Sequence, residues 1–412
     1  MNSEGATARD RASLIKSLHS LLFWASALGL VYLWLVGVGV VGAGFKWLSG
    51  GADGAQSIFA FASNPLVGVI LGTLATALVQ SSSTVTSVIV GLVAGGVPVS
   101  IAIPMIMGAN MGTTITNTIV SLGNLRQRQD FARSFRAATV HDFFNLYSIV
   151  IFLPLEILFQ PLERTSNVLA QWFSVGGSAS MQGANIIGTI TKPPAQWVVS
   201  RMSDLPTALG AGLTIAIGIT LIMFSVIYLG KLLRRAMTGQ AQRIVDAAIG
   251  RGPVTGIMSG TLVTVLVQSS STTTSLVVPL AGAGVLTTKQ IYPFTLGANI
   301  GTCITALLAA TAISGENQVF ALQIALAHLL YNVFGVLLFA MIPWLWSLPV
   351  RSATWLGNCV ESNRSWALVY LLVVFFALPG AVFGAEYLFS QPDIPVDTAT
   401  QGQLKESGLK IE

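Results

Sequence analysis

The sequence predicts an all-α membrane protein that crosses the bilayer several times and contains two repeats of inverted topology. Three observations lead to this prediction: an apolar composition, long stretches without a charged residue, and polar motifs that occur twice at a nearly constant offset. We expect each repeat to hold a re-entrant hairpin and a transmembrane helix that is broken in its middle.

The composition excludes an ordinary soluble protein. Of the 412 residues, 53% are hydrophobic and 9% are charged, whereas soluble domains carry about 25% charged residues. No Asp, Glu, Lys or Arg occurs between Gly54 and Leu125. Because one crossing needs about 20 apolar residues, a stretch of this length implies several spans. The apolar run from Leu21 to Phe45 is longer than the hydrophobic region of a cleaved signal peptide, about 7–15 residues, so we expect it to be retained as the first helix.

Length and hydropathy predict seven spans and six segments. The spans are expected at about residues 18–47, 101–122, 137–159, 207–229, 292–313, 319–346 and 366–388. The segments are expected to be a cytoplasmic tail (1–17), transport repeat 1 (18–160), a polar external linker (161–205), transport repeat 2 (206–347), a link with the final transmembrane helix (348–389) and a polar C-terminal tail (390–412).

The distribution of basic residues sets the expected orientation. With the N-terminus inside, most of the 21 lysines and arginines fall in inside segments, as the positive-inside rule requires. Clusters at residues 126–136 and 231–251 carry much of this asymmetry. The basic pI of about 9.4 therefore needs no nucleic acid partner.

The most unusual feature is a polar stretch in apolar surroundings, and it occurs twice. Gln80–Ser87 and Gln268–Ser275 are identical at seven of eight positions, at an offset of 188 residues. Each stretch lies between two apolar pieces that are too short to cross a bilayer alone. We therefore expect two re-entrant hairpins, at about residues 66–97 and 254–284, with these stretches at their tips.

Two further motifs repeat with nearly the same spacing. Gly-Ala-Asn-x-Gly-Thr begins at Gly108 and Gly297, where we expect the breaks in the two transmembrane helices, and His-x-x-x-Asn begins at His141 and His328. Because the first repeat starts inside and the second starts outside, equivalent elements should run in opposite directions. Inverted repeats with broken helices are typical of secondary transporters, whose binding site lies near the membrane midplane.

The polar stretches offer groups that bind two kinds of ion. A half-helix that begins inside the membrane directs free N–H groups and its positive dipole end at the gap, which suits a small oxyanion. The expected anion ligands are Ser81, Ser82, Ser83, Ser269, Ser270 and Ser271. Side-chain oxygens suit Na⁺, and the expected sodium ligands are Gln80, Thr84, Asn110, Thr113, Gln268, Thr272, Asn299 and Thr302. No Lys or Arg lies in either stretch, so bound Na⁺ would have to offset the charge of the anion.

Close packing is the alternative role for these small polar residues. Ser, Thr and Gly often allow helices to approach in membranes, and we expect this of Gly68-x-x-x-Gly72 and Gly256-x-x-x-Gly260. For the paired Gln-led stretches we favour binding. For four supporting residues, hydrogen bonding between helices is slightly favoured over direct ligation: His141, Asn145, His328 and Asn332.

The remaining titratable and sulfur groups receive simpler interpretations. Asp142, Glu156 and Glu386 are expected as solvated carboxylates near the ends of spans. Cys303 and Cys359 lie far apart, so neither a disulfide framework nor a cysteine metal site is expected.

These residues resemble the type II sodium-dependent phosphate cotransporters. Gln80–Ser83 and Gln268–Ser271 match the paired Gln-Ser-Ser-Ser signature of that family, and residues 103–113 and 322–328 are similar to its other conserved segments. The resemblance covers about residues 60–160 and 205–390. It implies symport of Na⁺ and inorganic phosphate, with phosphate near the hairpin tips, Na⁺ as the co-transported ion, no cofactor and no enzymatic activity.

The chain departs from the animal members of that family. We expect no large disulfide-bonded outer loop and no further C-terminal span, and no regulatory helical domain such as many bacterial relatives carry. This compact form favours a multi-pass protein of a bacterial inner membrane, surrounded by lipid, with a homodimer as a candidate assembly. A carrier of dicarboxylate or sulfate is the alternative, followed by a passive anion channel and an intramembrane enzyme, for which no nucleophile–base arrangement is evident.

Overall fold

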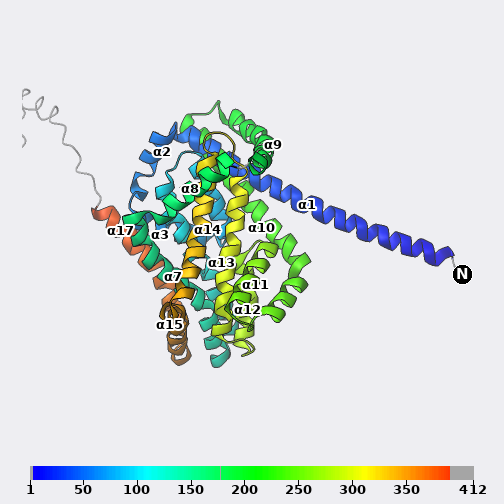
Figure 1. The fold of residues 1–412 in the computed structure, drawn as a ribbon, viewed down its shortest axis with the longest axis vertical. Helices are drawn as coiled ribbons and strands as arrows, with labels where there is room; N and C mark the ends of the chain where they lie inside the picture. Colours follow the sequence, from blue (N-terminus) through cyan, green and yellow to red (C-terminus); the bar gives the residue numbers. More distant parts are fainter. Residues whose placement is uncertain (1–2, 177, 390–412) are drawn as a thin grey trace, which may run out of the picture.

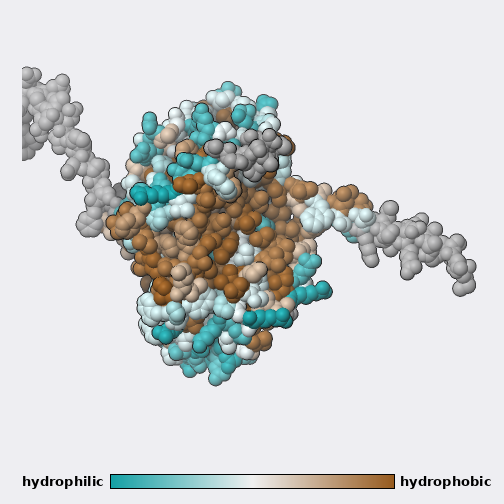
Figure 2. Space-filling view, viewed as in Figure 1, coloured by the Kyte–Doolittle hydropathy of each residue, from teal (hydrophilic) through white to brown (hydrophobic). Residues whose placement is uncertain are grey.

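The described part of the chain is helical. The computed structural model describes residues 3–176 and 178–389, and these residues contain no β-strand. On the face shown in Figure 2, an apolar band across the middle of the body separates two more polar ends. Seven helices among the described residues are long and apolar enough to cross a membrane: Ser17–Ser49, Val99–Asn124, Arg128–Phe159, Thr207–Met237, Thr288–Ala310, Gln318–Met341 and Ser365–Val382. The predictions of an all-α fold and of seven candidate spans are therefore confirmed.

The helices follow one another with short connections (Figure 1). In chain order they are α1 (Ser3–Ser49), α2 (Ala52–Ile58), α3 (Pro65–Val79), α4 (Ser82–Ala94), α5 (Val99–Thr113), α6 (Ile115–Ser121), α7 (Arg128–Phe159), α8 (Pro161–Gly176), α9 (Ser178–Met202), α10 (Thr207–Ala248), α11 (Pro253–Val267), α12 (Ser270–Gly282), α13 (Thr288–Ala310), α14 (Gln318–Met341), α15 (Pro343–Ser362), α16 (Ser365–Leu372) and α17 (Leu378–Phe389). Two 3₁₀ segments, Ala60–Ala62 and Leu122–Asn124, and a π-helical segment, Val373–Ala377, complete the described part.

Two helix–turn–helix units, α3–α4 and α11–α12, contain the Gln-led stretches. Gln80 ends α3 and Gln268 ends α11, each in the left-handed conformation, with φ of 57° and 55°. The next residues, Ser81 and Ser269, are the N-caps of α4 and α12, and their hydroxyls accept the third N–H of the new helix. A left-handed residue followed by a serine N-cap stops one helix and starts the next.

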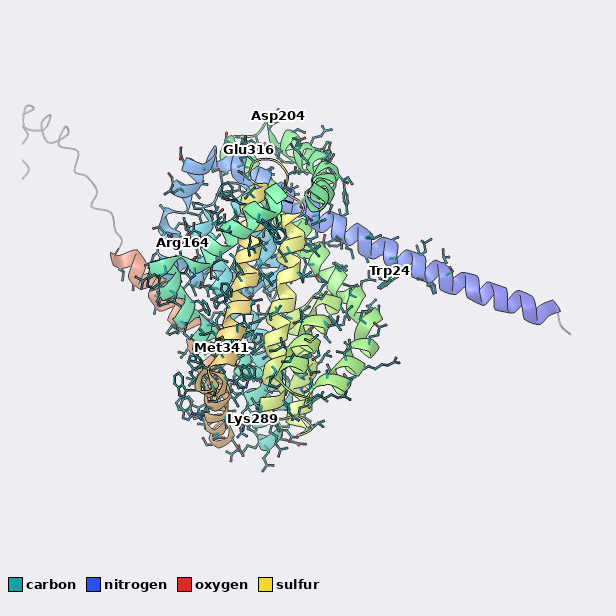
Figure 3. All side chains as sticks on the ribbon, viewed as in Figure 1. Trp24, Arg164, Asp204, Lys289, Glu316 and Met341 are labelled. Atoms are coloured by element: carbon teal, nitrogen blue, oxygen red, sulfur yellow. The ribbon has the colours of Figure 1, made fainter. Side chains whose placement is uncertain are left out.

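The two units approach the middle of the body from opposite ends. Asn317, in the connection between α13 and α14, donates a 2.7 Å hydrogen bond to the carbonyl of Ala94 at the end of α4. At the end of α12, Gly282 lies against the side chains of Asn124 and Ser134, beside the start of α7. Glu316 and Lys289 mark these two regions and lie at opposite ends of the body (Figure 3).

The expected break is wrong for the second Gly-Ala-Asn motif, while at the first motif helix α5 ends at the motif's last residue, Thr113. Helix α13 is continuous through Gly297–Thr302. Thr114 joins α5 to α6 with near-helical dihedral angles.

The glycines of these motifs allow close helix crossings. A Cβ atom on Gly108 would overlap the carbonyl oxygen of Val69, and one on Gly297 would overlap that of Ile257. Thr261 of α11 donates to the carbonyl of Gly297 at 3.0 Å, and the equivalent bond joins α3 to α5. Small residues at such crossings permit van der Waals packing in a membrane, where the hydrophobic effect between helices is absent.

The segment from 161 to 205 is mostly helical where it is described. Helices α8 and α9 occupy most of this expected polar linker. The carboxylate of Glu156 caps the N-terminus of α8, since it accepts hydrogen bonds from the N–H groups of Leu162 and Glu163 at 2.8 and 2.9 Å. The expectation that Glu156 is a solvated carboxylate is therefore wrong, since it caps a helix and is only 7% exposed. The Glu386 side chain and the tail after residue 389 lie outside the described residues.

The expected span at 319–346 is too long. Helix α14 ends at Met341, Ile342 is extended, and Pro343 begins α15. The helix stops there because a proline disfavours the helical conformation of the residue before it.

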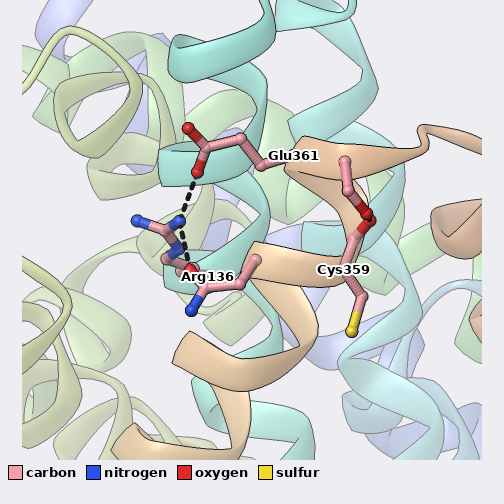
Figure 4. A network of polar contacts seen from close by, with 5 residues as sticks. Arg136, Cys359 and Glu361 are labelled. Atoms are coloured by element: carbon pink, nitrogen blue, oxygen red, sulfur yellow. Dashed lines mark hydrogen bonds and ion pairs between the residues drawn. The ribbon is translucent and has the colours of Figure 1, made fainter.

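An ion pair joins α15 to α7. Arg136 donates to Glu361 at 2.7 Å and also to Asn358 at 2.7 Å (Figure 4).

We predict that Gly297→Ala lowers the stability of the fold, because its methyl group would overlap the backbone of α11. Overpacking of this kind costs about 1–3 kcal/mol. The measurement is the apparent melting temperature of the detergent-purified protein. The matched control is Gly212→Ala in α10, where a methyl group meets nothing within 4 Å. Equal melting temperatures for the two variants would contradict the close packing of α13 against α11 at Gly297.

Candidate functional site

The two Gln-Ser-Ser-Ser turns meet at one cavity of about 170 Å³. The cavity also contacts one face of α10. Its lining consists of Gln80, Ser81, Ser82, Ser83, Gln268, Ser269, Ser270 and Ser271, with Val226, Ile227, Gly230, Lys231 and Arg234 of α10. The structure thus brings together all six predicted anion ligands and two of the predicted sodium ligands.

The two turns are held in shape by their own side chains. Gln80 donates to the carbonyl of Ala77 and accepts a 2.9 Å bond from Thr116 of α6. Gln268 donates to the carbonyl of Val265 at 2.7 Å. Both glutamines therefore use side-chain amide groups to cover carbonyls that the end of a helix leaves without an intrahelical partner.

The threonines after the serines have different partners in the two turns. Thr84 is buried and donates to Ser81 at 2.9 Å. Thr272 accepts a 2.6 Å bond from the guanidinium of Arg234. The two turns are thus similar in backbone but differ in charge, because the threonine of the second turn bonds to a basic side chain and that of the first bonds to a serine.

Lys231 and Arg234 are site residues that the motif search missed. Sequence reasoning placed them in a basic loop after a span ending at 229, but α10 continues as a helix to Ala248. Residues 227, 231 and 234 then share one face of that helix, which is the face that lines the cavity. This spacing is visible in the sequence once the helix is extended. Two basic side chains thus line the same cavity as the predicted anion ligands, although no Lys or Arg lies in the Gln-led stretches themselves.

The first Gly-Ala-Asn motif supplies a buried polar contact between the repeats. Asn110 of α5 donates to Asn332 of α14 at 2.9 Å, and its side-chain oxygen lies 3.0 Å from Nε2 of His328. All three side chains are at most 2% exposed. The side-chain amide of Asn110 therefore bonds to the second repeat.

The second motif makes the reciprocal contact. Asn299 of α13 donates to Asn145 of α7 at 2.8 Å, and its oxygen lies 2.6 Å from Nε2 of His141. Asn145 also donates to the carbonyl of Asn110 at 3.1 Å, which connects the two halves of the network. The asparagine of each repeat thus pairs with the histidine and asparagine of the other.

The threonines of these motifs bond within their own helices. Thr113 donates to the carbonyl of Ala109 and Thr302 to that of Ala298, both at 3.0 Å. Neither they nor Asn110 and Asn299 line the cavity between the turns. The predicted sodium ligands therefore fall into two groups, one at the turns and one in the buried network.

Asp142 is a second residue that sequence reasoning placed wrongly. It was expected near the end of a span, but α7 begins at Arg128 and Asp142 is fully buried. Its Oδ2 atom accepts bonds from Tyr370 at 2.9 Å and Thr118 at 3.3 Å, while Oδ1 has no hydrogen-bond partner among the described residues. A buried carboxylate with hydroxyl neighbours offers hard oxygen ligands to a cation such as Na⁺.

A larger cavity lies elsewhere and contains none of the repeated polar motifs. It measures about 420 Å³ and lies between α1, α9 and the connection after α13, with Lys46, Lys192 and Glu316 in its lining. No residue of the Gln-led turns contributes to it. The smaller cavity is the candidate site because both Gln-led turns line it.

Comparisons with known proteins agree with the motifs. A sequence model described as Na⁺/Pi-cotransporter matches residues 33–176 and 221–348. Sodium-dependent phosphate transport protein 2A of Rattus norvegicus is 34% identical, over 90% of this chain and 69% of the rat protein. Sodium-dependent phosphate transport protein 2B of Homo sapiens is 33% identical, over 87% of this chain and 64% of the human protein. The chain thus spans about two thirds of the length of these relatives. No solved structure matches the chain.

We predict that Asn299→Ala destabilises the protein, because it leaves Nε2 of His141 and the side-chain oxygen of Asn145 without their buried partner. Such a loss costs about 1–3 kcal/mol. Thermal unfolding in detergent measures the effect, and Thr220→Ala, at an exposed position of α10, is the control. The network would not stabilise the contact between repeats if both variants melted at the wild-type temperature.

Proposed function

The chain belongs to the Na⁺/Pi-cotransporter family, and from this premise we propose that it carries inorganic phosphate together with Na⁺ across the plasma membrane by alternating access. The observation that carries this proposal is the single cavity lined by both Gln-Ser-Ser-Ser turns. Phosphate binds between the turns, and the bacterial inner membrane is the proposed location.

The first turns of α4 and α12 supply the groups that bind the phosphate. Each begins at a serine N-cap whose following N–H groups have no earlier carbonyl in their own helix. These N–H groups can donate hydrogen bonds, and the helix dipoles place partial positive charge at the same ends. Further hydroxyl donors come from four serines of the lining: Ser82, Ser83, Ser270 and Ser271. A tetrahedral oxyanion accepts hydrogen bonds from both sides of such a cavity.

Alternating access is supported by the arrangement of the two helix–turn–helix units. Helix α4 ends beside the connection after α13, and α12 ends beside the start of α7, so the units enter from opposite ends of the body. We interpret them as re-entrant hairpins of two inverted repeats that meet near the midplane. The region around Lys289 is the proposed cytoplasmic end, because the basic cluster of residues 126–136 lies beside the end of α12.

Sodium binds at oxygen atoms close to the turns and in the core. Gln80, Gln268, Thr84 and Thr272 offer side-chain oxygens next to the helix ends, where a carbonyl of the preceding helix is also free. Asp142 adds a buried carboxylate, close to Thr118 of α6. The described residues hold no cluster of three or more His, Cys, Asp or Glu side chains, so this proposal rests on neutral oxygens and a single carboxylate.

We predict that Ser82→Ala and Gln268→Ala each reduce Na⁺-dependent phosphate uptake to background, because both side chains line the cavity. The measurement is uptake of radiolabelled phosphate into proteoliposomes, with Na⁺ or K⁺ outside. Ser200→Ala, an exposed serine in α9, should transport like the wild type.

Three results of this assay would overturn the proposal or its site. Equal wild-type uptake in Na⁺ and K⁺ would indicate a passive anion channel. Stronger inhibition by sulfate or succinate than by unlabelled phosphate would identify another anion as substrate. Wild-type uptake by both variants would remove the turns from the site.

We predict that Asp142→Asn raises the Na⁺ concentration for half-maximal uptake by about tenfold or more, because the amide keeps the shape but removes the charge. The exposed Asp53→Asn is the control. If the Na⁺ dependence of Asp142→Asn matched that of the control, Asp142 would serve only as a hydrogen-bond acceptor for Tyr370 and Thr118.

A further inference from the structure

We infer that Lys231 and Arg234 of α10 form the third wall of the phosphate site, and that Arg234 moves its hydrogen bond from Thr272 to the bound anion. This inference rests on the proposed function and adds a role for α10, which contains none of the repeated motifs. It assigns the recognition of negative charge to two side chains outside the Gln-led turns.

The position of the pair supports this role. Both residues line the cavity together with the serines of the two turns. Arg234 reaches the first turn of α12, where it donates to the Thr272 hydroxyl at 2.6 Å. Lys231 has its ammonium 5.0 Å from the centre of the Tyr228 ring, which holds its side chain along α10.

The charge of the cavity supports an anionic ligand. Its lining contains two basic residues and no acidic residue; the other lining residues are serine, glutamine, glycine and aliphatic side chains. Two helix N-termini add further positive potential. Electrostatic attraction in a small, partly enclosed cavity is stronger than on an open surface, so an anion with several oxygens is the ligand that this set fits.

The geometry of arginine explains the exchange with Thr272. A guanidinium carries five N–H donors in one plane and binds two oxygens of a phosphate at once. The Thr272 hydroxyl is a neutral acceptor, and a charged acceptor forms a stronger bond with the same donor. Thr272 also keeps its backbone bond to the Ser269 hydroxyl, so the N-terminus of α12 remains ordered when Arg234 moves.

An ordinary role for basic residues at a membrane surface is the competing explanation. Arg235 follows directly in the sequence and is exposed like Lys231 and Arg234, but it does not line the cavity. It carries the same charge on the same helix, so it would contribute equally to orientation or lipid binding. Arg235→Gln is therefore the matched control for Arg234→Gln and Lys231→Gln.

The first test measures the KM for phosphate in proteoliposomes at saturating Na⁺. We expect Arg234→Gln to raise this KM by about 10- to 100-fold, as expected for the loss of a charged hydrogen bond. Lys231→Gln should raise it less, Arg234→Lys should recover part of the affinity, and Arg235→Gln should match the wild type. If the wild type transports with Na⁺ while Arg234→Gln and Lys231→Gln both match Arg235→Gln, this inference is overturned and the proposed function stands. Wild-type uptake at the same rate with and without Na⁺ would instead overturn the proposed function.

The second test reports binding without depending on transport. Arg234→Cys is combined with Cys359→Ser, since the other cysteine, Cys303, is buried. Inorganic phosphate with Na⁺ should slow the reaction of the introduced thiol with a methanethiosulfonate reagent. An aminoethyl adduct, which is positively charged, should restore the affinity for phosphate, whereas a negatively charged sulfonatoethyl adduct should not. Modification at the same rate with and without phosphate, and equal affinities of the two adducts, would overturn the inference.

Discussion

The broken backbone at Gln80 and Gln268 is the constraint on which the rest of the structure depends. At each position a helix ends and another begins inside the body, so carbonyl and N–H groups lose their helical partners. Such groups are tolerated at membrane depth only where protein, water or a ligand replaces those partners. The glutamine amides cover part of the carbonyl ends, and the serine N-caps cover part of the N–H ends. Both turns line one cavity, and under the proposed function a bound anion would accept hydrogen bonds from the N–H groups that remain.

Glycine crossings and the polar network connect each turn to the long helices. Helix α3 crosses α5 and α11 crosses α13 at glycines, so closely that a methyl group would not fit. The asparagines of α5 and α13 in turn bond to the histidines and asparagines of the opposite repeat. Under the proposed alternating access, a displacement of one turn would be transmitted to a helix whose core contacts belong to the other repeat. This reciprocal bonding gives the two halves a physical reason to move together.

The parts of the fold that could be predicted from the sequence are those set by local chemistry. Apolar length predicted the seven candidate spans, and the left-handed Gln followed by Ser at the two turns lies where the polar stretches indicated. The Gly-Ala-Asn motif was a poor predictor of helix breaks, because glycine is compatible both with a break in a helix and with a close helix crossing. Only the position of the neighbouring backbone decides between the two. Asp142 and Arg234 were misplaced for a related reason, since hydropathy does not reveal how far a helix continues beyond its apolar part. Tertiary contacts of this kind have no local signature.

The basic wall of α10 changes the role that Na⁺ has to fill. With no charge near the turns, Na⁺ would be needed to neutralise the anion, and coupling would be purely electrostatic. With Lys231 and Arg234 in the lining, the protein supplies that charge itself. Under the proposed symport, coupling would then require that Na⁺ changes the shape or order of the site. The contact of Gln80 with Thr116 and that of Asp142 with Thr118 provide such a route, because both end on α6, and α6 also contacts α12 through Asn117 and Thr274. A cation held by these oxygens would order α6 and, through it, both turns, so that phosphate meets a complete set of donors only after Na⁺ has bound.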